Sequence, residues 1–282
     1  MSLAFSKPPI PSDADSQKLC DGLLNAVLAA ATVYYSLPKE QGITLRKTVR
    51  EAVADIVEVT IQLTELILNS RIQSLSQAQL VSTGSVWEAC DQCEKLPKDN
   101  HAAVVLSISG YLGVVKDAVE EVEQALAGGE DPFNDIPDDE DNDIGARGNQ
   151  DTYWSEADRK LMAPCLGLMK VAKACLKKLL GALKAHGKVD TLIHVAQLDD
   201  LVDVTQEVSP SVDDLALSMY PPMIHATVRL NAAKLSSVLK KVLNITRSSH
   251  ICPDTEYSWV QFLDNAVDHN MEKTKNLTQG AI

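Results

Sequence analysis

The feature that most constrains this chain is an acidic segment near its middle. Residues 117–146 hold twelve Asp and Glu side chains and no Lys or Arg, out of 39 acidic and 26 basic residues in all, so the remainder is nearly neutral. Within this segment, residues 128–143 add two prolines and two glycines to the densest charge. Such a stretch buries too little apolar surface to offset its conformational entropy. We therefore expect a flexible acidic linker at 128–152, between domains at 1–127 and 153–282.

Apolar residues recur at helical spacing in both halves, and no strand-like alternation is sustained. Aromatic residues make up only 4% of the chain, so the packing is expected to be aliphatic. The sequence therefore predicts an all-α fold of two helical bundles. The expected helices span residues 13–37, 45–67, 85–93 and 100–126 before the acidic segment, and 155–185, 190–208, 209–220, 223–246 and 257–277 after it.

Two of these helices carry distinctive signals. The helix at 100–126 is apolar nearly all round at its start, so we expect it to be central. The helix at 155–185 begins with Ser155, a good N-cap, and Asp158 follows three residues on. Pro164 falls inside this helix and is expected to kink it or to mark its true first turn.

No catalytic signature is present in the sequence. It lacks a glycine-rich phosphate loop, an H-E-x-x-H zinc motif and a G-x-S-x-G nucleophile motif. The pair Cys90 and Cys93 is the one pattern that suits zinc or redox chemistry, but no second Cys or His pair stands at metal spacing. The six histidines are scattered. We predict that the protein is not an enzyme and holds no metal or cofactor.

Composition also limits the partners. A pI near 4.9 argues against general nucleic-acid binding. No run of 18 apolar residues occurs, so no membrane-spanning helix is expected. Six cysteines are too few for a disulfide framework in a chain of 282 residues, which favours a reducing intracellular compartment.

Two charged surfaces are candidates for binding. A basic face is expected on the helix after the acidic segment; it is either a solvated face or a docking site for an acidic partner or for the chain's own acidic segment. An acidic surface is expected within residues 195–223, either solvated or protein-binding. The basic residues are Lys170, Lys173, Lys177 and Lys178. The acidic residues are Asp199, Asp200, Asp203, Asp213 and Asp214.

Four stretches carry a resemblance to a known family: VYYSLPKEQGITLRKTVR at 33–50, NQDTYWSEAD at 149–158, KACLKKL at 173–179, and VAQLDDLVDVTQEVSPSVDDLALSMYPPM at 195–223. From about Pro11 to its end, the chain closely resembles the cyclin-D-binding protein family, the Grap- and cyclin-D-interacting proteins. The last stretch is the most distinctive. The acidic segment lies where this family has its acidic region.

The resemblance implies an all-helical, two-domain, non-enzymatic protein of the cytoplasm and nucleus. It implies binding to a D-type cyclin and a Grap-type adaptor, and reduced phosphorylation of the retinoblastoma protein by the cyclin-D-dependent kinase. It also implies inhibition of helix-loop-helix transcription factors without contact to DNA, and no Lys/Arg-rich segment precedes a helix pair here. The alternative is a helical-bundle adaptor of vinculin- or talin-like type in signalling or cytoskeletal assemblies.

The resemblance also implies a difference at the N-terminus. Family members usually carry a further N-terminal helical segment, so this chain is expected to be a shorter form. Its first bundle would then expose an apolar groove, which would favour a homo-oligomer or capture of a partner.

Overall fold

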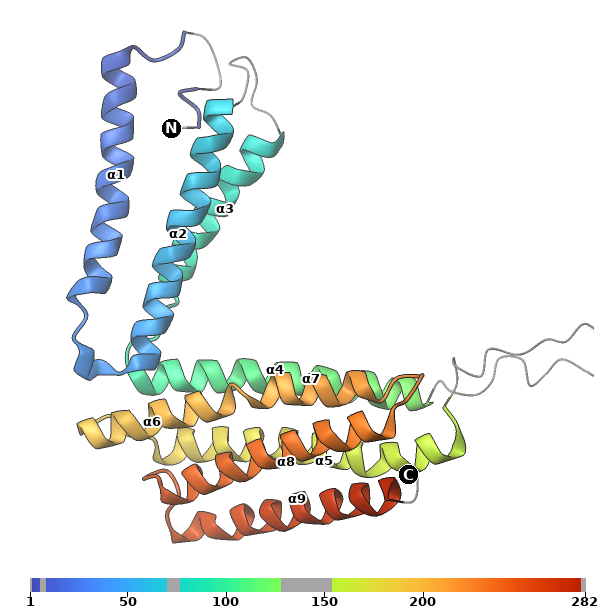
Figure 1. Cartoon of the computed structure of the whole chain (residues 1–282). Coiled ribbons are helices and arrows are strands. Elements are labelled where there is room, and N and C mark those ends of the chain that lie inside the picture. The colour runs from blue at the N-terminus through green and yellow to red at the C-terminus, as the bar shows by residue number, and fades with distance from the viewer. Residues whose placement is uncertain (1, 6–8, 70–76, 128–153, 280–282) are drawn as a thin grey trace, which may run out of the picture. The chain divides into compact units, whose positions relative to one another are not determined.

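Figure 1 shows a computed structural model of the chain, which describes residues 2–5, 9–69, 77–127 and 154–279. Every regular element in these residues is a helix, so the predicted all-α fold is confirmed. The helices form two compact units, Met1–Ala103 and Val104–Ile282. The linker predicted at 128–152 lies outside the described residues.

The first unit contains α1 (Asp13–Ser36), the short 3₁₀ helix η1 (Lys39–Gln41), α2 (Ile43–Asn69) and α3 (Gln77–Cys93). Ser12 caps α1, because its Oγ accepts a hydrogen bond from the Asp15 backbone N–H at 3.2 Å. Gly42 joins η1 to α2 with φ 111°, a conformation that side chains disfavour. A Cβ there would also collide with the Asn100 side chain, whose Oδ1 accepts from the Leu45 backbone N–H at 2.9 Å.

The prediction of a short helix at 85–93 was wrong at its N-terminal end, since α3 begins at Gln77. The first turns of α3 contain polar residues, so apolar periodicity does not reveal where the helix begins, yet part of this polar stretch is buried. The Gln79 amide lies inside the unit, where its Nε2 donates to the Ser2 carbonyl at 3.1 Å. A buried hydrogen bond to a residue far away in sequence therefore replaces the apolar contact that the periodicity would have revealed.

The first unit has a thin core. Helix α2 contacts both α1 and α3, and Leu45 and Leu63 are its buried apolar side chains. Helix α1 has no buried residue at all. Most of the apolar surface of these helices is therefore only half-covered.

The second unit has a large aliphatic core. Helices α5, α8 and α9 pack against one another, and α7 and α6 pack against α8 (Figure 1). Leucine, valine and methionine side chains from all of these helices form one continuous buried cluster. The elements are α4 (Asn100–Ala127), α5 (Glu156–His186), α6 (Leu192–Thr205), α7 (Val208–Ser218), α8 (His225–Ser248), the 3₁₀ helix η3 (Asp254–Glu256) and α9 (Tyr257–Thr278).

Helix α4 shares the core of the second unit, although the sequence grouped it with the first domain. Ile108, Val115 and Val119 are buried in the same cluster as the apolar side chains of α5 and α8. Ser209 on α7 donates to the Tyr111 carbonyl at 3.4 Å. The apolar stripe of α4 therefore determines its packing partners, and the composition of the segment that follows it does not.

Helix α5 begins where the capping signal predicts. Ser155 Oγ accepts from the Asp158 backbone N–H at 3.1 Å, and the Asp158 carboxylate accepts from the Ser155 backbone N–H at 2.9 Å. This reciprocal pair satisfies two N–H groups at the helix start. Pro164 is buried within the helix and does not mark its first turn.

Two helices, α1 and α4, are long and apolar enough to cross a membrane by length and composition alone. The expectation of no such helix rested on continuous apolar runs, whereas an average over 18 residues tolerates scattered polar side chains. Core helices pass the same test, and α4 has the buried stripe of a core helix. Helix α1 lacks such burial.

Candidate functional site

The predicted acidic surface is divided by the fold. Asp199 on α6 is buried, with 6% of its surface exposed, whereas Asp200 and Asp203 on the same helix are exposed. Asp213 is half-buried and Asp214 is exposed on α7. Asp199 therefore belongs to the interior, and a partner could reach the other four residues.

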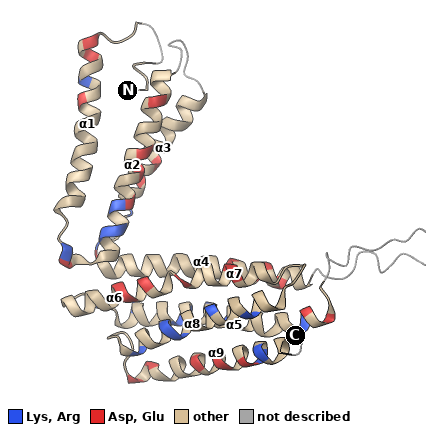
Figure 2. Ribbon diagram, viewed as in Figure 1, with Lys and Arg blue, Asp and Glu red and all other residues tan. Residues whose placement is uncertain are grey.

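Part of this acidic surface is neutralised within the unit. The Lys234 ammonium on α8 lies 2.7 Å from the Asp214 carboxylate, and Lys241, seven residues on, lies 3.8 Å from Glu207. Figure 2 shows basic residues along α8. Asp200 and Asp203 form no ion pair with any described residue and are exposed, so their charge is available to a partner.

Asp213 is partly buried and lies close to two other carboxylates. Burial raises the pKa of its carboxyl group, and the nearby Asp214 and Glu121 carboxylates raise it further. Tyr220 at the end of this region donates to Glu121 Oε1 at 3.2 Å. The structure thus brings the acids of α7 and α4 together, a proximity that the sequence did not reveal.

The predicted basic face is also partly occupied. The Lys170 ammonium lies 2.6 Å from Glu123 and Lys173 lies 3.8 Å from Glu120, and both acids are on α4. Hydrogen bonding from Lys170 lowers the pKa of Glu123. These two glutamates belong to the acidic segment at 117–146, so its helical beginning already pairs with this face.

The remaining lysines of the basic face stay accessible. Lys177 and Lys178 are exposed and form no ion pair with the described part of the chain. They line an open cavity of about 470 Å³ near Glu256. A docking role for an acidic group is therefore confined to these two lysines, and it remains a prediction.

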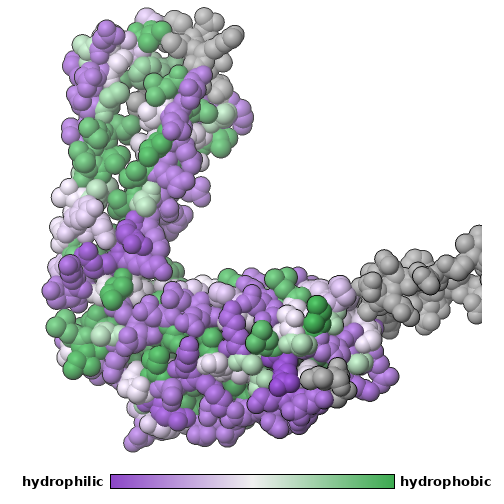
Figure 3. All heavy atoms as spheres, in the orientation of Figure 1, coloured by the Kyte–Doolittle hydropathy of each residue, from purple (hydrophilic) through white to green (hydrophobic). Residues whose placement is uncertain are grey.

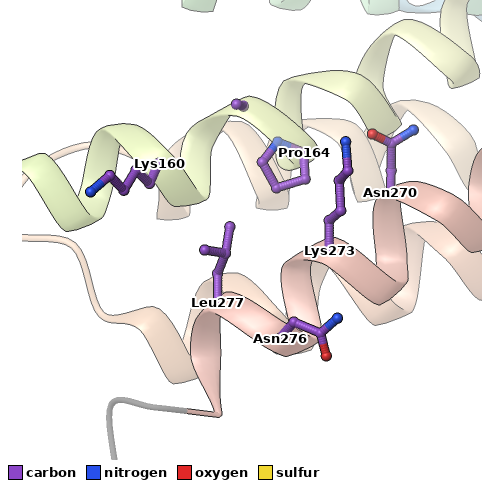
Figure 4. A pocket seen from close by; sticks show the side chains of 7 residues that line it. Lys160, Pro164, Asn270, Lys273, Asn276 and Leu277 are labelled. Atoms are coloured by element: carbon purple, nitrogen blue, oxygen red, sulfur yellow. The ribbon is translucent and has the colours of Figure 1, made fainter.

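A second cavity of about 480 Å³, which sequence reasoning missed, lies between α5 and α9. Figure 4 shows Pro164 and Leu277 directed towards each other across it, with Lys160 and Lys273 at its sides. Lys160 is held by Glu156 at 2.6 Å. Two lysines, two asparagines and apolar groups line this cavity. Its lining contains no carboxylate or imidazole that could transfer a proton.

One histidine and one cysteine have environments that suit a structural role. The Asp158 carboxylate lies 2.5 Å from His225 Nε2. Burial opposes its ionisation, but hydrogen bonds from His225 and Ser155 outweigh burial and lower the pKa of Asp158. Burial, followed by the nearby Cys90 and Asp55, raises the pKa of Cys93, which disfavours the thiolate needed for zinc or redox chemistry. Among the described residues, no three His, Cys, Asp or Glu side chains converge as metal ligands would.

The first unit offers a different kind of surface. Leu24, Leu28 and Tyr35 on α1 are 57%, 53% and 79% exposed. Figure 3 shows apolar atoms gathered over α1 and on the side of α1 that faces α2. Apolar surface of this kind on a long helix is typical of a protein-binding face.

Comparison with known proteins matches both parts of the chain to one family. The N-terminal model described as "Grap2 and cyclin-D-interacting" matches residues 1–128, and its C-terminal counterpart matches residues 136–244. The chain belongs to this family. The N-terminal model ends and the C-terminal model begins within the acidic segment, whereas the compact units of the fold meet at Ala103 and Val104.

Relatives of this family member are similar over its whole length. "Cyclin-D1-binding protein 1 homolog" of Xenopus laevis is 82% identical over 282 residues, which cover 100% of this chain and 85% of the relative. The homolog of Danio rerio is 53% identical over 277 residues, 98% of this chain and 80% of its own. "Cyclin-D1-binding protein 1" of Homo sapiens is 48% identical over 293 residues, 100% of this chain and 80% of the human protein.

Proposed function

We propose that this protein is a non-enzymatic regulator that binds a D-type cyclin. The observation that carries the proposal is the 82% identity, over the whole chain, to a protein named for cyclin-D1 binding. The described surface supports a binding role, because it offers exposed charged and apolar helix faces. The two cavities described above lack a convergent set of catalytic side chains.

The finer parts of the proposal follow from the same family membership. Binding to the cyclin reduces phosphorylation of the retinoblastoma protein by the cyclin-D-dependent kinase. The protein also binds a Grap-type adaptor and helix-loop-helix transcription factors, and it acts in the cytoplasm and nucleus. Capture of a partner's amphipathic helix would block a transcription factor without any contact between this protein and DNA.

The exposed acids of α6 are the best candidates for the cyclin contact. Asp200 and Asp203 stand three residues apart on one helix and form no ion pair with a described residue, so a basic partner surface could pair with both. Asp199 is unsuitable for such a contact, because it is buried. Their exposure supports the choice of these two positions from the acidic set.

The test is a binding measurement with purified cyclin D1 and the full chain. We expect the double variant D200K/D203K to bind at least about tenfold more weakly, mainly through slower association, with the difference shrinking at high salt. The matched control D254K/E272K changes charge equally at exposed sites on η3 and α9. Equal losses in both double variants would remove the α6 acids from the proposed interface.

A kinase assay tests the regulatory part. Addition of the protein to the cyclin-D-dependent kinase should reduce phosphorylation of a retinoblastoma-derived substrate in proportion to the cyclin bound. If the full chain binds no cyclin D1 but sediments with actin filaments or a talin fragment, the adaptor alternative replaces this function.

A further inference from the structure

Two histidines that are far apart in the sequence meet at one end of the second unit, where α6 begins and α8 ends (Figure 1). His194 lies in the first turn of α6, and His250 lies just beyond the end of α8. Their rings lie against each other, with centroids 4.3 Å apart and an angle of 31° between the planes. Both side chains are half-buried. The contact therefore joins the start of one helix to the end of another through two groups that can take up a proton.

The hydrogen bonds around His250 fix its protonation state. The His250 backbone N–H donates to Gln197 Oε1 at 3.1 Å, so the atom of the Gln197 amide that faces it is the oxygen. This oxygen also lies 2.8 Å from His250 Nδ1, which must therefore carry a proton and donate it. On the other side of the ring, the Lys188 backbone N–H donates to Nε2 at 3.1 Å. Because Nε2 acts as an acceptor, the ring is neutral in this geometry.

A proton added to His250 would remove one of these bonds. The cationic imidazole is a donor at both nitrogens, so its Nε2–H would point at the Lys188 N–H, which would lose its acceptor. A charge on His250 would also oppose a charge on the His194 ring stacked against it. The charged side chains closest in sequence to Gln197 and Lys188 are exposed to solvent, where water screens them; they are Lys188 itself, Asp190 and Asp200.

The charged groups of α8, η3 and α9 at this end are engaged elsewhere. Arg247 on the last turn of α8 holds its guanidinium 6.0 Å from the centre of the Tyr257 ring. Glu256 in η3 accepts from Trp259 Nε1 at 2.5 Å and lies 3.7 Å from His186. None of these contacts offers the His250 ring a carboxylate that would favour its cationic form.

The bonds of His250 also fasten α6 to the rest of the unit. Helix α6 packs mainly on α8. His194 and Gln197 belong to its first two turns, and Lys188 stands in the connection that leads from α5 to it. Loss of the bonds to His250 would therefore release this connection and the start of α6 together.

We propose that His250 is a pH-sensitive switch: its neutral ring fastens the α5–α6 connection and the start of α6 to the end of α8, and protonation releases them. The switch is a property of this chain alone and does not depend on cyclin binding. Its release would nevertheless loosen the helix that carries Asp200 and Asp203, the acids proposed to contact the cyclin.

The direction of the pH dependence follows from the neutral ring. The folded chain holds the ring neutral, so the unfolded chain binds the proton more readily. By linkage, the stability that this ring contributes is complete above about pH 6.5, the ordinary pKa of a histidine, and it declines as the pH falls below that value. The start of α6 should therefore be well ordered at neutral pH and open more often in mild acid.

The test is hydrogen exchange of the full chain, followed by mass spectrometry at about pH 7.5 and about pH 5.5 and corrected for the intrinsic effect of pH on exchange. Peptides covering residues 187–198 should exchange about fivefold faster or more at the lower pH, whereas the buried part of α5 should not change. H250Q cannot be protonated in this range, and its side-chain oxygen can still accept from the Lys188 N–H, so it should abolish the response. The control H269Q removes an exposed histidine of α9 and should respond like wild type.

A second measurement needs no variant. Nitrogen NMR of the imidazole groups in the wild-type chain at about pH 7.5 should show the neutral Nδ1–H tautomer for His250. A cationic ring or an Nε2–H tautomer at this pH overturns the proposal, even if H250Q fails to fold. Equal protection of residues 187–198 at both pH values also overturns it, as does an H250Q variant that keeps the wild-type response.

Discussion

The contact between α5 and α9 makes a sharp prediction at Gly167. A Cβ added at this position would lie 2.8 Å from Asn270 Cγ on α9 and closer still to its Oδ1. The asparagine cannot move away freely, because its Nδ2 donates to the Ala266 carbonyl at 2.8 Å. Gly181 lies on the same helix, and a Cβ there meets no atom within 4 Å. The two glycines should therefore respond to the same substitution with opposite signs.

The magnitudes follow from three contributions. Alanine is favoured over glycine within a helix by about 1 kcal/mol, so Gly181→Ala should stabilise the second unit by roughly 0.5–1 kcal/mol. At Gly167 the same gain is opposed by overpacking of about 1–3 kcal/mol. Displacement of Asn270 also weakens a hydrogen bond of about 1 kcal/mol. Gly167→Ala should therefore destabilise the unit by about 1–3 kcal/mol.

Urea unfolding followed by tryptophan fluorescence measures both changes. A Trp87→Phe background removes the exposed tryptophan of the first unit and leaves Trp154 and Trp259 to report on the second. In an Asn270→Ala background the steric conflict is gone, so Gly167→Ala should become stabilising. If Gly167→Ala and Gly181→Ala raise the free energy of unfolding equally without that second change, the reasoning is refuted.

Three further predictions concern the cap, the acid stability and the thiols. Ser155→Ala should lower the free energy of unfolding by about 1 kcal/mol in the same assay, because the Asp158 N–H at the start of α5 loses its acceptor. Folding lowers the pKa of Asp158, so its ionised form stabilises the protein above the unfolded pKa of about 3.9, and this stabilisation is lost as the pH falls through the folded pKa. Asp158→Asn should therefore be less stable than wild type near pH 7 and approach wild-type stability at low pH. A difference in stability that stays constant with pH would contradict this. Burial raises the pKa of both Cys165 and Cys175 to about 12. When a thiol reagent is added at pH 8 and labelling is followed by mass spectrometry, the exposed Cys90 should be labelled well before these two. Equal labelling rates in the folded protein would contradict their burial.

Helix positions could be predicted where the signal is local. Ser155 and Asp158 are close in sequence and form the capping pair by themselves, so the start of α5 was predictable. The start of α3 was not predictable, because the Gln79 amide donates its hydrogen bond to Ser2, which is 77 residues away in the sequence. The long aliphatic stripes predicted the all-α class for a similar reason, since each stripe needs only its own helix to be recognised.

The candidate surfaces were predictable as composition but not as accessible groups. Asp199 and Asp200 are adjacent in the sequence, yet one is buried and the other is exposed. Lys170 and Lys177 belong to one basic face, but only Lys170 is paired with an acid of α4. Helical periodicity gives the side of a helix on which a residue stands, and it does not give which neighbour occupies that side.

The sequence by itself determined the helical class, the family and the capped start of α5, because these depend on residues near one another or on whole-chain similarity. The tertiary structure alone decided that α4 shares the core of the second unit and that α1 keeps an uncovered apolar stripe. An apolar stripe must be buried against something, but its pattern is the same whether the cover is its own unit or a second molecule. Only the packing of the other helices shows which surface is left.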